Sequence, residues 1–300
     1  MSARAASHRC GTAAIVGRPN VGKSTLLNAL LGQKLSITSG KPQTTRHRVT
    51  GVLTRPDAQF VFVDTPGFQT RHGGPLNQAL NRAVRAALET VDVVLFVVEA
   101  GRFEGADRTV LGLLPRGIPT VLVVNKSDRL GGPARMLPFL RQAAGEFEFA
   151  AVVPVSAARR TNLAALLKIL AALLPEQPPL FEAQTLTDRS ERFLAAELVR
   201  EKLFRLLGDE VPYGAAVSVD LFRTKGALRT IHVAVVVEKE NQRAIVVGKG
   251  GAKLKAIATA ARRDMEALFG GKVFLEVWVK VRRDWTGSAA ALRSLGIEHV

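Results

Sequence analysis

The sequence has little cysteine and no long hydrophobic run. Cys10 is the only cysteine, which excludes an intramolecular disulfide or a metal site made of several cysteines, and which fits a reducing compartment. The most apolar segment, Val91 to Val98, is interrupted by Asp92 and is too short to cross a bilayer. The first ten residues carry positive charge without an apolar stretch behind them, so we expect no secretory signal. Any membrane contact should therefore be peripheral.

Acidic residues are also scarce relative to basic ones. The chain has 42 Lys and Arg against 26 Asp and Glu, a formal net charge of +16 and a sequence pI near 10.8. Such a charge indicates a polyanionic partner, either nucleic acid or an anionic membrane surface, and charge alone does not choose between them. The 300 residues, 47% hydrophobic and 23% charged, are typical of a globular protein with room for two domains.

The stretch GRPNVGKST has the residue spacing of a phosphate-binding loop. It follows the short apolar run Ala13–Val16 and leads into Leu26–Leu31, which predicts a strand, a tight loop and a helix. Glycines let the backbone N–H groups approach an anion, Lys23 should reach the β- and γ-phosphates, and Ser24 should bind Mg²⁺. The alternative is a chance glycine-rich turn before an ordinary helix. The predicted nucleotide contacts here are Gly17, Arg18, Pro19, Asn20, Val21, Gly22, Lys23, Ser24 and Thr25.

Short apolar runs alternate with helix-like stretches over the first half of the chain, which predicts an α/β fold with a mostly parallel sheet. The predicted strands are Ala13–Val16, Val49–Leu53, Gln59–Val63, Val91–Val98, Thr120–Val124 and Ala151–Val155. The second and third should form a hairpin across Arg55-Pro56-Asp57. Nucleotides bind such sheets where the strands end, and a polar motif directly follows each predicted strand except Val49–Leu53.

The turn after Gln59–Val63 reads Asp64-Thr65-Pro66-Gly67. Asp64 can hold Mg²⁺ through water, and the Gly67 N–H can bond a γ-phosphate oxygen, so this turn can sense that phosphate. In the basic loop between the phosphate loop and Asp64, a threonine should reach Mg²⁺ in the GTP state. We favour Thr45, with Thr44 as the alternate. A polar surface loop is the competing interpretation.

Asn125-Lys126-Ser127-Asp128 follows Thr120–Val124. Asp128 can accept two hydrogen bonds from guanine, which adenine cannot donate, so we expect GTP and not ATP. The Lys126 stem can lie along the base, and Asn125 can tie this loop to the phosphate loop. Ser156 and Ala157 after the last strand would supply a backbone N–H for guanine O6.

The glutamine that orients water in many GTPases is missing. Phe68 directly follows Gly67, and Gln69 comes one residue late. We therefore expect slow intrinsic hydrolysis. The predicted catalytic residues are Lys23, Thr45, Gly67 and Asn20. Asn20 could help bind a potassium ion beside the phosphates, although an Asn that stabilises the turn is an equal alternative.

The second half begins after a proline-rich connector, Pro175-Glu176-Gln177-Pro178-Pro179. The predicted order is a helix begun by Asp188 and Glu191 and ended by Gly208, two strands, a short helix, GKGG, a long helix over Ala252–Phe269 and a strand. We assign residues 1–10 to a tail, 11–175 to the first domain, 176–187 to a linker, 188–284 to the second domain and 285–300 to an extension. A last helix is expected over Ala289–Leu295.

The second-half order resembles a KH domain of the bacterial type, an α+β type II fold whose GxxG loop clamps single-stranded nucleic acid. The residues that this implies for RNA binding are Gly248, Lys249, Gly250, Gly251, Lys253, Lys255, Ile245, Val246 and Arg262. The basic residues could instead form a solvated helix face, and Ile245, Val246 and Ile257 could be core. Trp285 could stack on a base, but packing between domains is the favoured interpretation.

The four nucleotide motifs resemble the GTPase superfamily, and together with VGKGGAKLKAI and KVFLEVWVKVRRDW the chain resembles the Era family. That resemblance implies GTP hydrolysis with Mg²⁺ coupled to binding the 3′ end of 16S rRNA, in assembly of the 30S subunit. It also implies a cytoplasmic protein with some peripheral inner-membrane association, and we expect a monomer. The alternatives are a GTPase of tRNA modification, a membrane-remodelling G protein, and an RNA-binding module with a vestigial nucleotide site.

Overall fold

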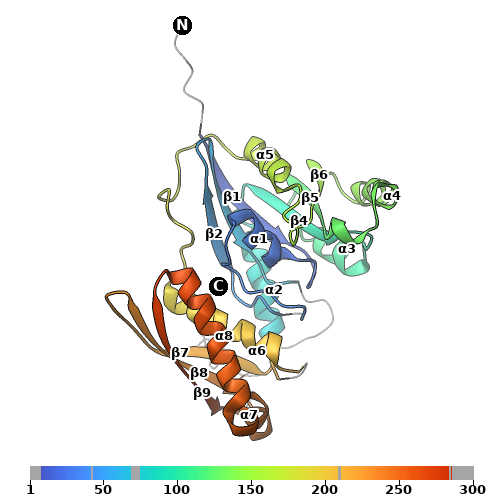
Figure 1. Cartoon of the computed structure of the whole chain (residues 1–300). Helices are drawn as coiled ribbons and strands as arrows, with labels where there is room; N and C mark the ends of the chain where they lie inside the picture. The colour runs from blue at the N-terminus through green and yellow to red at the C-terminus, as the bar shows by residue number, and fades with distance from the viewer. Residues whose placement is uncertain (1–7, 42, 69–74, 209–210, 284, 286–300) are drawn as a thin grey trace.

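The computed structural model describes residues 8–41, 43–68, 75–208, 211–283 and 285. Two separate sheets divide these residues, one of six strands in the first half of the chain and one of three strands in the second half. Figure 1 shows the two units stacked, with the start of the first strand at the end of the first unit that lies away from the second unit.

The first sheet is parallel apart from one edge strand, which confirms the predicted α/β class. Its strands are β1 (Arg9–Val16), β2 (Val49–Thr54), β3 (Ala58–Asp64), β4 (Val93–Glu99), β5 (Thr120–Asn125) and β6 (Ala151–Pro154). They lie in the order β2-β3-β1-β4-β5-β6, with β2 antiparallel to β3 as the predicted hairpin. The parallel strands end at one edge, so the polar residues that follow β1, β3, β5 and β6 meet there.

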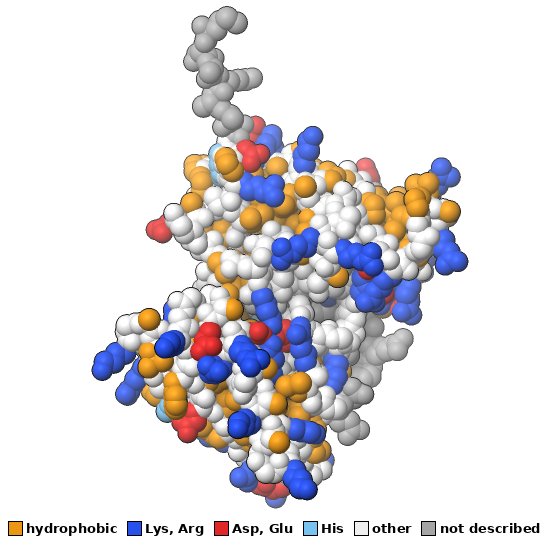
Figure 2. All heavy atoms as spheres, in the orientation of Figure 1, with side chains coloured by type: hydrophobic (Ala, Val, Ile, Leu, Met, Phe, Trp, Pro, Cys, Tyr) orange, Lys and Arg blue, Asp and Glu red, His pale blue; other side chains and the backbone are white. Residues whose placement is uncertain are grey.

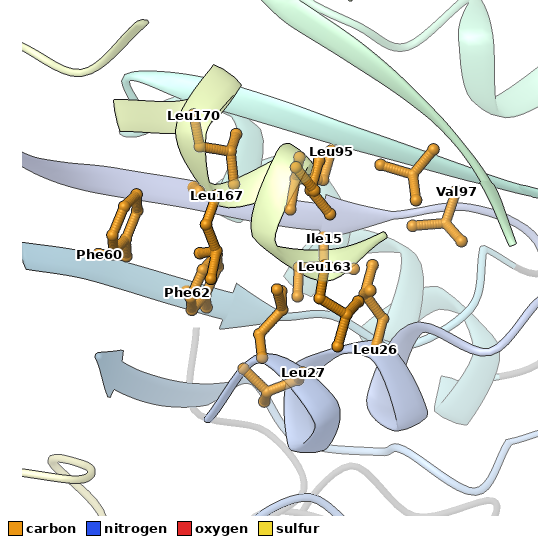
Figure 3. Close-up of a cluster of buried hydrophobic side chains, with 14 of the residues drawn as sticks. Ile15, Leu26, Leu27, Phe60, Phe62, Leu95, Val97, Leu163, Leu167 and Leu170 are labelled. Atoms are coloured by element: carbon orange, nitrogen blue, oxygen red, sulfur yellow. The ribbon is translucent and has the colours of Figure 1, made fainter. Parts of the chain in front are cut away.

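Helices cover both faces of this sheet. On one face lie α1 (Lys23–Leu31) and α5 (Leu163–Leu173), whose leucines pack on Ile15 and Leu95 from the sheet (Figure 3). On the other face lie α2 (Pro75–Leu88), α3 (Gly105–Leu111) and α4 (Pro133–Ala144). Strands with apolar side chains on both faces are what a sheet covered twice requires. The two layers hold the strand ends, and hence the loops, in fixed positions.

The connector after α5 is bound along the edge of the first domain. Gln177 Nε2 donates to Cys10 O at 2.8 Å, and Val52 N donates to Leu186 O at 2.8 Å. The buried Gln59 accepts from the backbone N–H groups of Leu180 and Phe181 at 2.8 and 2.9 Å. The strand β1 also starts at Arg9, inside the segment predicted to be a tail. Hydrogen bonds to the sheet, and not proline stiffness alone, therefore fix the path of the connector.

The second unit contains helices and strands in the predicted order. Its elements are α6 (Glu191–Leu206), β7 (Ala215–Lys225), β8 (Leu228–Val237), α7 (Glu240–Val247), the short 3₁₀ helix η2 (Lys249–Gly251), α8 (Ala252–Phe269) and β9 (Lys272–Val281). β8 lies between its two partners, antiparallel to β7 and parallel to β9. The helices α6 and α8 pack on one face of the sheet through a core that includes Leu198, Val233 and Met265.

Two details of this unit differ from the expectation or lie beyond it. Helix α6 is capped by Ser190, whose Oγ accepts from Phe193 N at 3.3 Å, and not by Asp188. Ser190 caps the helix because it directly precedes the first helical residue, Glu191. From that position a side-chain oxygen can accept from the N–H of the third helical residue. The helix expected over Ala289–Leu295 and the side chain of Gln69 fall outside the described residues.

Candidate nucleotide site and nucleic-acid interface

Lys23 lies under the phosphate loop with its ammonium group held by that loop. Its Nζ donates to Gly17 O at 2.9 Å and to Arg18 O at 3.0 Å, and the residue is 6% exposed. Burial lowers the pKa of Lys23 to about 8, against the opposing effect of nearby Asp64. A buried cation without a matching anion beside it is costly, so this site is electrostatically suited to phosphate.

Two glycines of the site have no room for a side chain. A Cβ on Gly22, which has φ near +100°, would lie 2.3 Å from Asn125 Nδ2, and one on Gly67 would lie 2.8 Å from Pro19 Cα. At Gly22 the phosphate loop therefore lies close against the loop after β5, and at Gly67 the turn after β3 lies close against the phosphate loop. Glycine is therefore required here by close approach of three loops.

Three oxygen-bearing side chains meet beside the first turn of α1. Ser24 Oγ donates to Asp64 Oδ2 at 2.7 Å and lies 2.8 Å from Thr45 Oγ1. Asp64 is fully buried, and its Oδ1 has no hydrogen-bond partner among the described residues. Burial raises the pKa of Asp64 to about 6. Hydroxyl and carboxylate oxygens are the ligands that Mg²⁺ takes, so these residues fit that ion.

Thr44 points elsewhere. Its Oγ1 donates to Lys41 O at 2.7 Å and lies 2.5 Å from Ser39 Oγ, within its own loop. Of the two threonines considered from the sequence, only Thr45 is within hydrogen-bond distance of Ser24 in the described structure.

The loops after β5 and β6 are joined around Asp128. Ser156 Oγ donates to Asp128 Oδ1 at 2.6 Å, and this bond holds the pKa of Asp128 below its usual value. Asp128 is therefore a carboxylate at neutral pH, which can only accept hydrogen bonds. Asn125 Nδ2 donates to Val21 O at 2.9 Å, as expected for a tie to the phosphate loop.

The GxxG segment forms the tight connection between α7 and α8. Gly248, Gly250 and Gly251 all have positive φ, and Gly251 N donates to Gly248 O at 3.1 Å. Lys249, Lys253 and Lys255 are exposed around it. Figure 2 shows Lys and Arg side chains spread over this face of the second unit. The start of α8 and the surrounding cations suit a phosphate backbone.

Comparison with known families divides the chain in the same way. Residues 12–126 match the family described as 50S ribosome-binding GTPase, and residues 210–286 match the KH domain. The GTPase Era of Nitrosomonas eutropha is 55% identical over 294 residues, which cover 98% of this chain and 99% of that protein. The GTPase Era of Chromobacterium violaceum is 57% identical over 289 residues, covering 96% and 98%.

The chain belongs to the Era family of GTPases. The predicted family, fold class and GTP hydrolase activity are thereby confirmed. Two solved Era structures match with a TM-score of 0.93 at 38% identity, covering 97% of this chain and all of theirs. One is an Aquifex aeolicus variant bound to GDP.AlF4⁻, and the other is a complex with MgGDPNP and nucleotides 1506–1542 of 16S ribosomal RNA.

Several predicted residues of this Era-family chain sit differently from expectation. The Arg18 guanidinium faces acids, with Nε 3.1 Å from Asp107 Oδ2, so near the phosphates Arg18 offers only its backbone. Ala157 N, expected at guanine O6, donates to Asn125 Oδ1 at 3.0 Å. Lys126 Nζ forms an ion pair with Glu99 at 3.1 Å.

Phe68 lies apart from the predicted catalytic residues, which line one pocket: Asn20, Lys23, Thr45 and Gly67. Phe68 is 8% exposed and belongs to the core cluster with Val16 and Val84, so it faces away from the phosphates. Asn20 is exposed in a left-handed conformation at the wall of the pocket. A buried phenyl ring cannot orient water, as the sequence predicted.

A pocket separates the phosphate loop from the loop that carries Thr45. It includes residues that sequence reasoning did not single out, namely Ile37, Thr38, Ser39, Lys41 and Gln43. They lie in a polar loop without periodicity, and only their position between two motifs could have indicated them.

Two predicted RNA contacts are internal or already paired. Val246 is fully buried in the core with Ile257, because α7 turns that side toward the sheet, so its side chain does not reach the surface. Ile245, by contrast, is 41% exposed. Arg262 Nη1 forms an ion pair with Glu266 at 2.9 Å, one turn along α8. Trp285 is fully buried, which agrees with packing and not with stacking on a base.

Among the residues that the structure describes, no helix is both long and apolar enough to cross a bilayer.

Proposed function

We propose that this chain is a GTP-controlled RNA-binding protein of small-subunit ribosome assembly. In this proposal the first domain binds GTP through Gly17–Thr25, Asp64–Gly67, Asn125–Asp128 and Ser156–Ala157. The GxxG surface binds single-stranded 16S rRNA near its 3′ end, because a solved Era structure of the same overall fold holds nucleotides 1506–1542 of that RNA. The domain bounds given above remain part of the proposal, as do a monomeric state and a cytoplasmic place with peripheral inner-membrane contact.

Ser24, Thr45 and Asp64 would hold Mg²⁺ in this site. The ion would neutralise charge on the β- and γ-phosphates as the bond between them breaks. Lys23 would bind the same two phosphates, and the Gly67 N–H would bond a γ-phosphate oxygen. With Phe68 in the core, hydrolysis should be slow until an RNA or ribosomal partner completes the site.

The observation that carries the proposal is that the loop beside the nucleotide also contacts the second domain. Glu201 of α6 is fully buried and accepts from Thr38 N at 2.9 Å and Lys34 Nζ at 2.5 Å. Lys34 Nζ also lies 2.6 Å from Asp264 of α8, the helix that begins at GxxG. Figure 2 shows acidic and basic side chains meeting at this junction. A loop ordered by GTP can therefore transmit its state toward the RNA surface.

The decisive experiment is crosslinking of the full-length protein to total RNA with a non-hydrolysable GTP analogue or GDP. We expect protected fragments from the 3′ end of 16S rRNA, with at least fivefold more crosslinking in the analogue. Linkage requires the same RNA to raise the ratio of analogue affinity to GDP affinity by the factor by which the analogue, relative to GDP, tightens RNA binding. An unchanged ratio of the two nucleotide affinities with and without RNA would contradict the switch. Lys23→Ala tests the alternative of a vestigial nucleotide site. A vestigial site predicts unchanged RNA crosslinking in this variant, whereas the switch predicts that crosslinking no longer depends on the nucleotide.

We propose Asn20 as a contributor to potassium binding beside the phosphates. Its exposed position in the pocket wall leaves its side-chain oxygen available to a cation. Hydrolysis should be several times faster in potassium than in sodium, and Asn20→Ala should remove that difference. Equal rates in the two salts for the unaltered protein would exclude the ion.

A further inference from the structure

Arg46 follows Thr45 and extends into the second domain. The side chain is almost completely buried, at 2% exposed. Its Nη1 donates to Ala215 O at 2.9 Å, and its Nη2 donates to Tyr213 O at 2.8 Å and to Pro212 O at 3.3 Å. One guanidinium thus binds three backbone carbonyls that precede or begin β7. A planar group with several fixed donors is suited to such a cluster, whereas a lysine ammonium is not.

The walls around this guanidinium also come from the second domain. The ring centroids of Phe204 and Trp285 lie 5.8 and 6.0 Å from Arg46 Cζ. Trp285 is itself fixed, because its Nε1 donates to Gly214 O at 3.1 Å. We call Phe204, residues 212–215 and Trp285 the Arg46 socket. Both rings are at most 1% exposed, so the socket is closed to water and its contacts are little weakened by solvent.

The loop that carries Thr45 is also held at its start. Arg205 Nε donates to Thr38 O at 2.9 Å, and Thr38 N donates to Glu201 at 2.9 Å, so α6 binds the backbone there through both a donor and an acceptor. Arg46 fixes the other end. Thr45 precedes Arg46 by one residue, about 3.8 Å along the backbone. A shift of Arg46 by more than an ångström must therefore move Thr45 away from Ser24.

We propose that Arg46 is a positioning residue through which the KH domain holds Thr45 at the magnesium site. The inference rests on the proposed role of Thr45 and adds that the first domain does not hold this threonine alone. Because Thr45 should act only when the γ-phosphate and Mg²⁺ are bound, Arg46 should matter for GTP and not for GDP. A residue that only stabilises the contact between the domains would change the affinities for GTP and GDP equally.

The test measures the affinity of full-length variants for a fluorescent non-hydrolysable GTP analogue and for fluorescent GDP, both with Mg²⁺. We expect Arg46→Ala to weaken the analogue about tenfold and GDP less than twofold. Arg46→Lys should recover only part of the loss, because an ammonium lacks the planar, fixed set of donors that the guanidinium presents to the three carbonyls. The matched control is Arg48→Ala, two residues along the same loop with an exposed side chain, which should change neither affinity. Equal losses for analogue and GDP in Arg46→Ala would overturn the proposal.

A second variant approaches the socket from the KH side. Trp285→Leu lies in the other domain, and we expect it to weaken the analogue selectively, as Arg46→Ala does. The double variant should lose no more than the worse single variant, because both changes break one connection. Additive losses, or a Trp285→Leu protein with an unchanged ratio of the two affinities, would overturn the inference.

Thr45→Ala separates this inference from the proposed function. If Thr45→Ala leaves analogue affinity intact, the assignment of Thr45 fails, and the Arg46 inference fails with it. If Thr45→Ala weakens the analogue while Arg46→Ala does not, only the positioning role is excluded.

Discussion

The chain has two glycine-rich loops suited to phosphate, and they solve that task differently. In the loop before α1 the cation is buried, with Lys23 6% exposed, and Gly22 is pressed against a neighbouring loop. In the loop before α8 the cations are exposed, and no described atom lies within 4 Å of where a Cβ on Gly251 would be. The first loop can enclose a compact triphosphate tightly, and the second can only clamp a strand that passes over it. The comparison indicates that the buried loop provides specificity for its ligand and that the exposed loop provides reversible binding.

Alanine at a glycine of each loop should give the largest contrast. Gly22→Ala places a methyl group 2.3 Å from Asn125 and in a left-handed conformation, so we expect more than a hundredfold loss of GTP affinity. Gly251→Ala meets open space, so its cost is limited to backbone strain of about 1 kcal/mol, or roughly fivefold in RNA affinity. Fluorescent nucleotide titration and RNA filter binding measure the two effects. Gly105→Ala, at an open site with ordinary φ, should change neither. A Gly251→Ala loss as large as that of Gly22→Ala would erase the distinction.

A change of pH should affect the buried site more than the exposed one. Burial raises the pKa of Asp64 to about 6, and only its carboxylate form can hold a cation. The carboxylate is therefore present at pH 7 to 8, and the neutral form gains as the pH falls through 6. Affinity for the GTP analogue with Mg²⁺ should fall about fourfold from pH 7.5 to 5.5, while affinity for GDP without Mg²⁺ changes less. A parallel decline of both nucleotides would point to general unfolding instead.

The nucleotide half could be read from the sequence because its motifs are local. Gly22 and Lys23 belong to the loop and helix that follow β1, and Asp64 is the last residue of β3. A parallel sheet brings the ends of these strands together whatever the loop details. The long helix Ala252–Phe269 was predicted with its observed bounds because glycines flank it on both sides. The domain bounds and the roles of individual site residues stay predictions.

The junction could not be read in this way. Arg46 and Glu201 look like ordinary charged residues in the sequence, one in a polar loop and one on a helix that is otherwise amphipathic. These two side chains are buried only because the two domains pack against each other. The spacing of apolar residues along the sequence does not indicate such packing between domains. The prediction that Val246 contacts RNA was wrong for a different reason. Val246 and its neighbour Ile245 are both apolar, and only the rotation of α7 decides which of the two side chains is exposed.

The salt dependence of RNA binding should give the smallest of these effects, and one that does not involve the nucleotide site. Lys249 and Lys253 are exposed, so each should contribute to RNA binding by releasing counterions, and each should account for about 0.7 in the slope of log affinity against log salt. The double variant Lys249→Ala/Lys253→Ala should weaken RNA binding severalfold at low salt, reduce that slope by about 1.4, and leave nucleotide affinity unchanged. Lys168→Ala, exposed on α5, is the matched control and should leave the slope intact. An unchanged slope in the double variant would mean that the strand passes elsewhere, and that the exposed loop is a turn and not a clamp.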